Sequence, residues 1–96
     1  MPNASASTNK ALPQSYYLCY GSNTATLRQC IRDAQRAARS PDAPPTERHL
    51  HRIIASAGLE SLHHIKSCQA APAQRAERLV NNAIRQLETI RVEAAL

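Results

Sequence analysis

Residues 72–95, PAQRAERLVNNAIRQLETIRVEAA, carry the most regular apolar pattern in this 96-residue chain. Their small and apolar side chains recur at alternating spacings of three and four: Ala73, Ala76, Val80, Ala83, Leu87, Ile90 and Ala94. Such spacing predicts one long amphipathic helix, which Leu79 and Ile84 widen on its flanks. Because four of these seven residues are alanine, we expect the helix to pack in an antiparallel bundle rather than in a parallel zipper.

The segment 23–39 predicts a second amphipathic helix. Its apolar positions are again three and four residues apart: Leu27, Cys30, Ile31, Ala34, Ala37 and Ala38. The opposite face carries a row of like charges: Arg28, Arg32, Arg36 and Arg39. Like charges at this spacing repel each other by a few tenths of a kcal/mol per pair. The row therefore gains stability when an anion or an acidic surface lies against it.

Residues 46–68 predict a further helix, whose continuity depends on Gly58. Leu50 and Ile54 belong to one apolar stripe, whereas Leu59 and Leu62, beyond the glycine, point elsewhere. Either Gly58 separates two helices, or a single helix continues and is apolar on two sides. An isolated glycine costs a helix only about 1 kcal/mol. We favour one continuous, central helix that contacts its own fold on one face and a partner on the other.

Together these patterns predict an all-α fold, a three-helix antiparallel bundle. The helices are expected over about 23–39, 46–68 and 72–95, within a single domain that spans residues 16–96. Residues 1–15 are rich in Ser, Asn, Ala and Pro, so we expect a flexible tail there. The core is thin because alanine supplies much of the apolar content, and burial against a second subunit or a partner is the economical source of further stability. A homodimer is expected.

The segment YYLCY, residues 16–20, contains every aromatic ring of the chain. Tyr16, Leu18 and Tyr20 alternate with Tyr17 and Cys19, which is the period of an extended strand and predicts a short extended Tyr-rich arm over residues 16–21. No second strand is predicted, so the arm has three possible roles. It covers the helices as a lid, pairs with the same segment of a second subunit, or adds to the sheet edge of another protein.

Two further patterns in the sequence are weaker indications of a site. His64 and Cys68 have the spacing of metal ligands on a helix, but a structural zinc site needs four ligands, so we expect no metal and no cofactor. A helix-turn-helix interpretation places a turn at Gly58 and a DNA-contacting helix over residues 60–68. Glu60 and a single lysine make that helix poorly charged for contacts with phosphates.

The composition favours interaction over catalysis. The chain has two glycines, which allow no phosphate-binding loop, and its carboxylates are scattered. The N-terminus lacks the pattern of a signal peptide, and no apolar stretch reaches the length of a membrane span. We therefore expect a soluble cytoplasmic protein that is not an enzyme and does not insert into a membrane.

The sequence predicts a small regulator or inhibitor that occupies a surface of a larger protein. The expected contact residues are Tyr16, Tyr17, Leu18, Tyr20, Leu59 and Leu62. The net charge of +5, and above all the arginine row at Arg28, Arg32, Arg36 and Arg39, would steer the protein to an acidic partner. The alternative is a nucleic-acid-binding regulator that uses the same arginines or the helix-turn-helix around Gly58.

Overall fold

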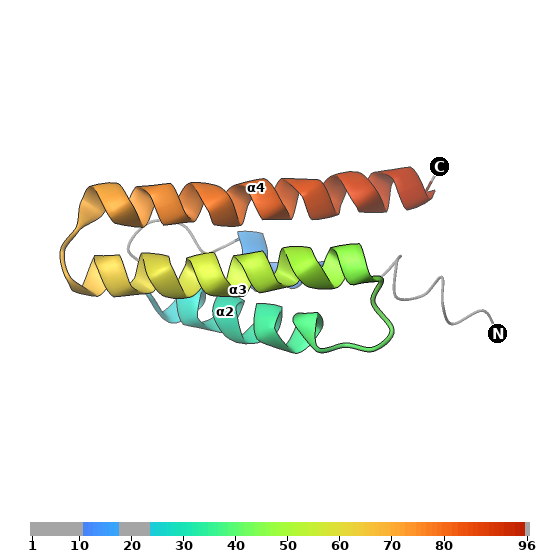
Figure 1. Cartoon of the computed structure of the whole chain (residues 1–96), viewed down its shortest axis with the longest axis horizontal. Helices are drawn as coiled ribbons and strands as arrows, with labels where there is room; N and C mark the ends of the chain where they lie inside the picture. The colour runs from blue at the N-terminus through green and yellow to red at the C-terminus, as the bar shows by residue number, and fades with distance from the viewer. Residues whose placement is uncertain (1–10, 18–23, 96) are drawn as a thin grey trace.

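The computed structural model describes residues 11–17 and 24–95, and it contains three long helices (Figure 1). Helix α2 spans Thr24–Ala38, α3 spans Pro45–Lys66 and α4 spans Ala70–Ala95. Consecutive helices run in opposite directions, and α3 lies in the middle with contacts to both α2 and α4. This arrangement confirms the predicted all-α antiparallel three-helix bundle. The helix ends fall within two residues of the expected positions, which is the usual uncertainty of a helix boundary.

Helix α3 continues through Gly58 without a break. A Cβ atom at Gly58 would lie only 2.9 Å from Ile31 Cγ1 of α2, so the absent side chain is what lets the two helices approach each other here. The expected continuous helix is confirmed. The helix-turn-helix interpretation is wrong, because no turn separates residues 53–57 from residues 60–66.

A tight turn over residues 67–69 connects α3 to α4. The N–H groups of Ser67, Cys68 and Gln69 donate to the last carbonyls of α3, at 3.1, 3.0 and 2.8 Å. Cys68 takes a left-handed backbone conformation with φ 57°, which ends the helical path. The expected helix to residue 68 is therefore two residues too long, and Cys68 lies outside the helix that carries His64.

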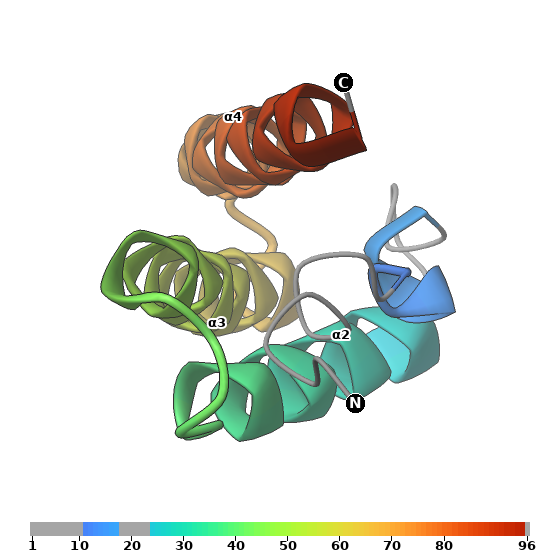
Figure 2. The same cartoon turned by 90° about the vertical axis from the view of Figure 1, so that its right-hand side faces the viewer.

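The core contains apolar side chains from all three helices and from residues 11–17. Its largest fully buried members are Tyr16, Ile54, Leu87, Val80 and Cys30. Figure 2 shows the short 3-10 helix η1, Gln14–Tyr17, in the space between α2 and α4, across from α3. Leu12 and Tyr16 belong to the same apolar cluster as the helix residues. Residues 11–17 thus occupy the position that a fourth helix has in a four-helix bundle.

The conformation of residues 11–17 differs from the expected tail and extended arm. Tyr16 and Tyr17 lie in η1, in which the Tyr16 N–H donates to Pro13 O at 3.0 Å. Leu12 and Ser15 are buried, although they fall in the expected flexible tail. Residues 11–17 and 24–95 contain no strand with which this segment could pair, and a 3-10 turn satisfies the backbone locally and still buries an aromatic ring.

Several predictions for this part of the chain fall on residues that the structure does not describe. These are the tail over residues 1–10 and the arm residues Leu18, Cys19, Tyr20 and Gly21. Over residues 11–17 and 24–95, no helix is both long enough and apolar enough to cross a lipid bilayer.

Candidate functional site

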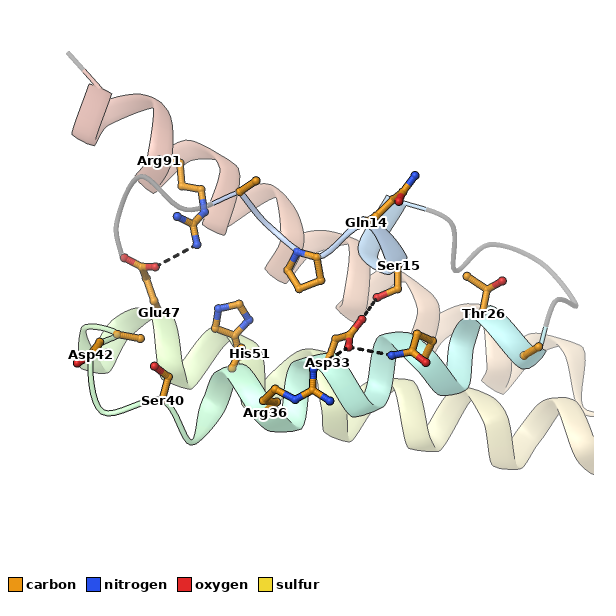
Figure 3. A pocket seen from close by; sticks show the side chains of 16 residues that line it. Gln14, Ser15, Thr26, Asp33, Arg36, Ser40, Asp42, Glu47, His51 and Arg91 are labelled. Atoms are coloured by element: carbon orange, nitrogen blue, oxygen red, sulfur yellow. Dashed lines mark hydrogen bonds and ion pairs between the residues drawn. The ribbon is translucent and has the colours of Figure 1, made fainter. Parts of the chain in front are cut away.

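One flank of α2 borders a cleft of about 1140 Å³ (Figure 3). Residues 11–15, α2, the loop after α2, the start of α3 and Arg91 of α4 form its walls. The side chains that line it include Ser15, Asp33, Glu47 and His51. Ser15, Glu47 and His51 are all buried, so three of the four buried polar side chains in the described part of the chain line this cleft. Such groups require partners.

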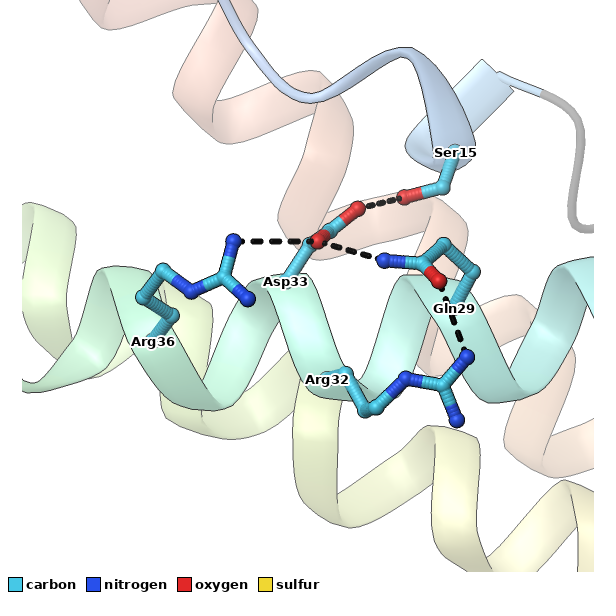
Figure 4. Close-up of polar contacts among 5 residues, drawn as sticks. All are labelled: Ser15, Gln29, Arg32, Asp33 and Arg36. Atoms are coloured by element: carbon cyan, nitrogen blue, oxygen red, sulfur yellow. Dashed lines mark hydrogen bonds and ion pairs between the residues drawn. The ribbon is translucent and has the colours of Figure 1, made fainter.

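Asp33 ties residues 11–17 to α2 (Figure 4). One carboxylate oxygen accepts a hydrogen bond from Ser15 Oγ at 2.7 Å, and the other accepts one from Gln29 Nε2 at 2.9 Å. The Arg36 guanidinium lies 3.8 Å from the same carboxylate, but its side chain is 77% exposed, so solvent screens this pair. Arg32 is turned away and donates to Gln29 Oε1 at 2.8 Å.

Tyr16 and His51 form a second bridge, between η1 and α3. The Tyr16 hydroxyl and His51 Nδ1 are 2.7 Å apart, and both residues are buried. Burial is the main cause, and the positive charge of Arg91 the second, of a His51 pKa that is lowered from 6.5 to about 4. The imidazole is therefore neutral at neutral pH, and one of its nitrogens shares a hydrogen bond with the tyrosine.

Glu47 and Arg91 pair across the cleft from the start of α3 to the end of α4. The distance between Glu47 Oε1 and the Arg91 guanidinium is 3.5 Å, and Glu47 is only 3% exposed. The polar groups of the cleft thus bond to one another and hold four parts of the chain together. Ser15 donates to Asp33 and not to His51, so these residues do not form the serine–histidine pair of a nucleophilic enzyme.

The other flank of α2 faces α3 across an open groove. The residues that line this groove, here the α2–α3 groove, are Gln35, Ala38, Arg39, Arg48, Arg52, Ala55, Ser56 and Leu59. The two alanines are buried and form its floor, whereas Leu59 is 48% exposed. Arg48, Arg52 and Leu59 lie on one side of α3, because positions four and seven residues apart share a helix face.

The charge of the α2–α3 groove is positive and uncompensated. Its lining includes three arginines and no carboxylate. Among residues 11–17 and 24–95, the ion pairs are Arg36–Asp33 and Arg91–Glu47, and neither is in the groove. Arg48 is half-buried, and its Nε has no hydrogen-bond partner in that same part of the chain. The α2–α3 groove thus combines an exposed leucine with three guanidinium groups that have no ion pair with any residue that the structure describes.

The expected apolar contact residues are separated by the fold. Tyr16 is completely buried, and Leu62 is half-buried and packs against the core. In this conformation Tyr16 offers no surface to a partner, which agrees with the lid interpretation, whereas a partner contact of Leu62 stays a prediction. Leu59 and Tyr17 remain exposed, at 48% and 43%. Leu18 and Tyr20 lie outside the described residues.

The expected arginine row is also divided. Residues four apart in an α-helix are offset by about 40°, so a row with this spacing winds around the helix. Arg36 consequently lines the cleft, and Arg39 lines the α2–α3 groove. Arg28 and Arg32 are exposed and line neither the cleft nor the groove. The groove arginines of α3, Arg48 and Arg52, were missed from sequence, although their spacing from Leu59 was visible.

The metal candidates are not brought together as ligands. His64 Nδ1 is hydrogen-bonded to Gln69 Oε1 at 2.8 Å, and Cys68 is exposed in the turn after α3. Within the described ranges, no three side chains of His, Cys, Asp or Glu gather in a way that would hold a metal ion.

A scan against models of known protein families, a search of curated proteins and a search of solved structures each found no match to this chain. The functional interpretation therefore rests on the residues and contacts of the chain itself.

Proposed function

We propose that this protein is a small, non-catalytic regulator that acts as a homodimer and binds an acidic segment of a larger protein, such as a transcription regulator or an enzyme complex, in the α2–α3 groove. One observation carries the proposal. The groove brings an exposed leucine, Leu59, together with Arg39, Arg48 and Arg52, which have no carboxylate partner among the described residues. Regulation would be steric, because the bound segment is no longer accessible to others.

The chemistry of the groove specifies the kind of segment that fits. An apolar side chain of the partner would cover Leu59, and carboxylates on either side of it would accept hydrogen bonds from the guanidinium forks. Arg48 and Arg52 are separated from Leu59 by about two to three helical turns at most, a span of roughly 16 Å. A short acidic amphipathic helix, with apolar and acidic residues on one face, covers this length.

Nucleic acid is the competing ligand for the same arginines. The net charge of +5 favours any polyanion, but a phosphate backbone has no apolar group to cover Leu59. The two ligands differ in their response to salt. Phosphate binding weakens steeply as salt rises because counterions are released, whereas an anchor that depends on Leu59 keeps most of its affinity.

The test is affinity capture from the source cell with the tagged full chain, with and without nuclease. The groove variants are Leu59→Ser and Arg39→Ala/Arg52→Ala. Their matched controls are Val92→Ser, which changes another exposed apolar residue, and Arg78→Ala/Arg85→Ala, which removes two exposed arginines of α4. We expect both groove variants to reduce recovery of one acidic protein by about tenfold or more, and both controls to leave it unchanged.

Three outcomes would contradict the proposal. Recovery that is abolished by nuclease would assign the groove to nucleic acid, and a labelled DNA duplex should then bind with a steep salt dependence. Equal recovery of the partner by Leu59→Ser and by the wild type would show that Leu59 does not contact the partner. Equal losses in the groove variants and in their matched controls would show only a general charge effect.

A further inference from the structure

The side of α4 that faces away from the cleft carries a stripe of residues that is complementary to itself. Its members are Arg75, Leu79, Asn82, Gln86, Ile90 and Glu93, at spacings of three and four along the helix. Leu79 is 51% exposed, and Ile90 is partly buried at the edge of the core. The four polar residues are exposed. Arg75 and Glu93 make no ion pair with any residue that the structure describes.

The order of these residues is symmetric about the middle of the stripe. Arg75 and Glu93 are five helical turns apart and point in the same direction, because an α-helix has about 3.6 residues per turn. Leu79 and Ile90 are placed in the same way inside them, and Asn82 and Gln86 inside those. All three pairs are centred at or beside residue 84. The two members of each pair match chemically: opposite charges, two apolar side chains, and two carboxamides.

We infer that α4 pairs with α4 of a second copy of the chain, in antiparallel orientation about a twofold axis near residue 84. In this arrangement Arg75 meets the partner subunit's Glu93, and Leu79 meets the partner subunit's Ile90. Each of these contacts occurs twice, as twofold symmetry requires. A parallel arrangement would place Arg75 against the partner's Arg75, which is repulsive.

This pairing supplies the extra burial that a bundle with an alanine-rich core needs. It covers Leu79, one of the few large apolar side chains exposed in the described part of the chain. It also leaves the α2–α3 groove open, since α4 does not line that groove. The inference deepens the homodimer in the proposed function and rests on that part of it, but it does not depend on what binds in the groove.

The test is sedimentation of the full chain at micromolar concentration with charge-swapped variants. Arg75→Glu and Glu93→Arg should each raise the dimer dissociation constant by about tenfold, because two attractive contacts become two repulsive ones. The double variant Arg75→Glu/Glu93→Arg should restore dimerisation. Leu79→Asp should raise the constant by about a hundredfold. Arg85→Glu and Val92→Asp are matched controls on other sides of α4, and they should sediment like the wild type.

Circular dichroism on every variant shows whether the helices are retained, and partner capture by Leu79→Asp shows whether the α2–α3 groove still works. A monomeric wild-type protein would overturn the inference, as would a dimer that Leu79→Asp does not weaken. If the double variant remains as weak as the single ones, the antiparallel pairing is wrong. Loss of dimer with partner capture intact, or the reverse, separates this inference from the proposed binding in the groove.

Discussion

The two flanks of α2 use the same kinds of residues in opposite ways. On the cleft side, buried side chains bond to other side chains of the cleft or core: Ser15 bonds to Asp33, Tyr16 to His51 and Glu47 to Arg91. On the groove side, three arginines and an exposed leucine line one open surface, and the arginines have no ion pair with a carboxylate in the described part of the chain. The cleft side therefore holds the fold together, and the groove side is available for another molecule.

The size of a cavity alone points to the cleft, and not to the groove that we propose as the binding surface. The cleft is larger and contains more titratable groups, but its hydrogen bonds are already made within the chain. Unsatisfied charge beside exposed apolar surface is a better guide to binding than volume. The difference can be tested, because changes on the cleft side should alter stability and changes on the groove side should alter binding.

The largest expected effect is that of removing the Tyr16 ring. Tyr16 is completely buried among side chains of the bundle, so Tyr16→Ala should lower the free energy of unfolding by about 3–5 kcal/mol. Tyr16→Phe keeps the ring and loses only the hydroxyl, and it should cost about 1–2 kcal/mol because His51 loses its partner. Urea unfolding followed by circular dichroism measures both. Tyr17→Ala is the control, because Tyr17 is next to Tyr16 but exposed. An equal loss of unfolding free energy in Tyr17→Ala would contradict the stabilising role of the buried Tyr16 ring.

The next effect is a loss of stability in acid that depends on His51. Its pKa is about 4 in the folded chain and about 6.5 when unfolded, so the unfolded state binds the proton more tightly. Stability from this group is complete above about pH 6.5 and falls as the pH is lowered to about 4, by up to roughly 3 kcal/mol. Urea unfolding across this pH range measures the decline.

His51→Gln is the control for this pH dependence, because it keeps a polar side chain at the position and cannot titrate. Its unfolding free energy should change less with pH than that of the wild type between about pH 6.5 and about pH 4. If the unfolding free energies of the wild type and His51→Gln change in parallel with pH, the neutral buried imidazole does not contribute to stability. The Tyr16–His51 contact would then no longer distinguish the cleft side from the groove side.

The smallest expected effect on stability is on the groove side. Arg39→Ala/Arg52→Ala should change the free energy of unfolding by no more than about 0.5 kcal/mol, because neither exposed guanidinium has an ion pair with a described residue. Asp33→Ala on the cleft side should cost about 1–2 kcal/mol, since it leaves buried Ser15 without its acceptor. Equal costs on the two flanks would remove the distinction between them.

The helices could be predicted because their signals are local. The seam from Ala73 to Ala94 repeats at helical spacing, and the structure has α4 over the same residues. The continuity of α3 through Gly58 was also accessible, since the energetic cost of one glycine is small. The extended arm at Tyr16 and Tyr17 was not correct, because a period of two over a few residues also fits a short turn that buries one ring of a pair.

The contacts of the cleft could not be predicted, because they join distant parts of the chain. Tyr16 and His51 are 35 positions apart, and Arg91 and Glu47 are 44 positions apart. No periodicity connects such residues. The groove could be predicted in part, because Leu59 and Arg39 were identified separately from sequence. Only the packing of α2 against α3 brings these two residues to one surface together with Arg48 and Arg52.

Gly58, whose side chain is a single hydrogen atom, also affects the shape of the α2–α3 groove on the outside of the molecule. Any larger group there would push against Ile31, since even a methyl carbon would come within 2.9 Å of it. A larger side chain would push α2 away from α3. It would thereby widen the groove in which Ala38 and Ala55 lie between the arginines. A substitution at a buried position, which no ligand contacts, can therefore change the proposed binding surface. The width of the groove depends on how closely α2 and α3 pack in the interior.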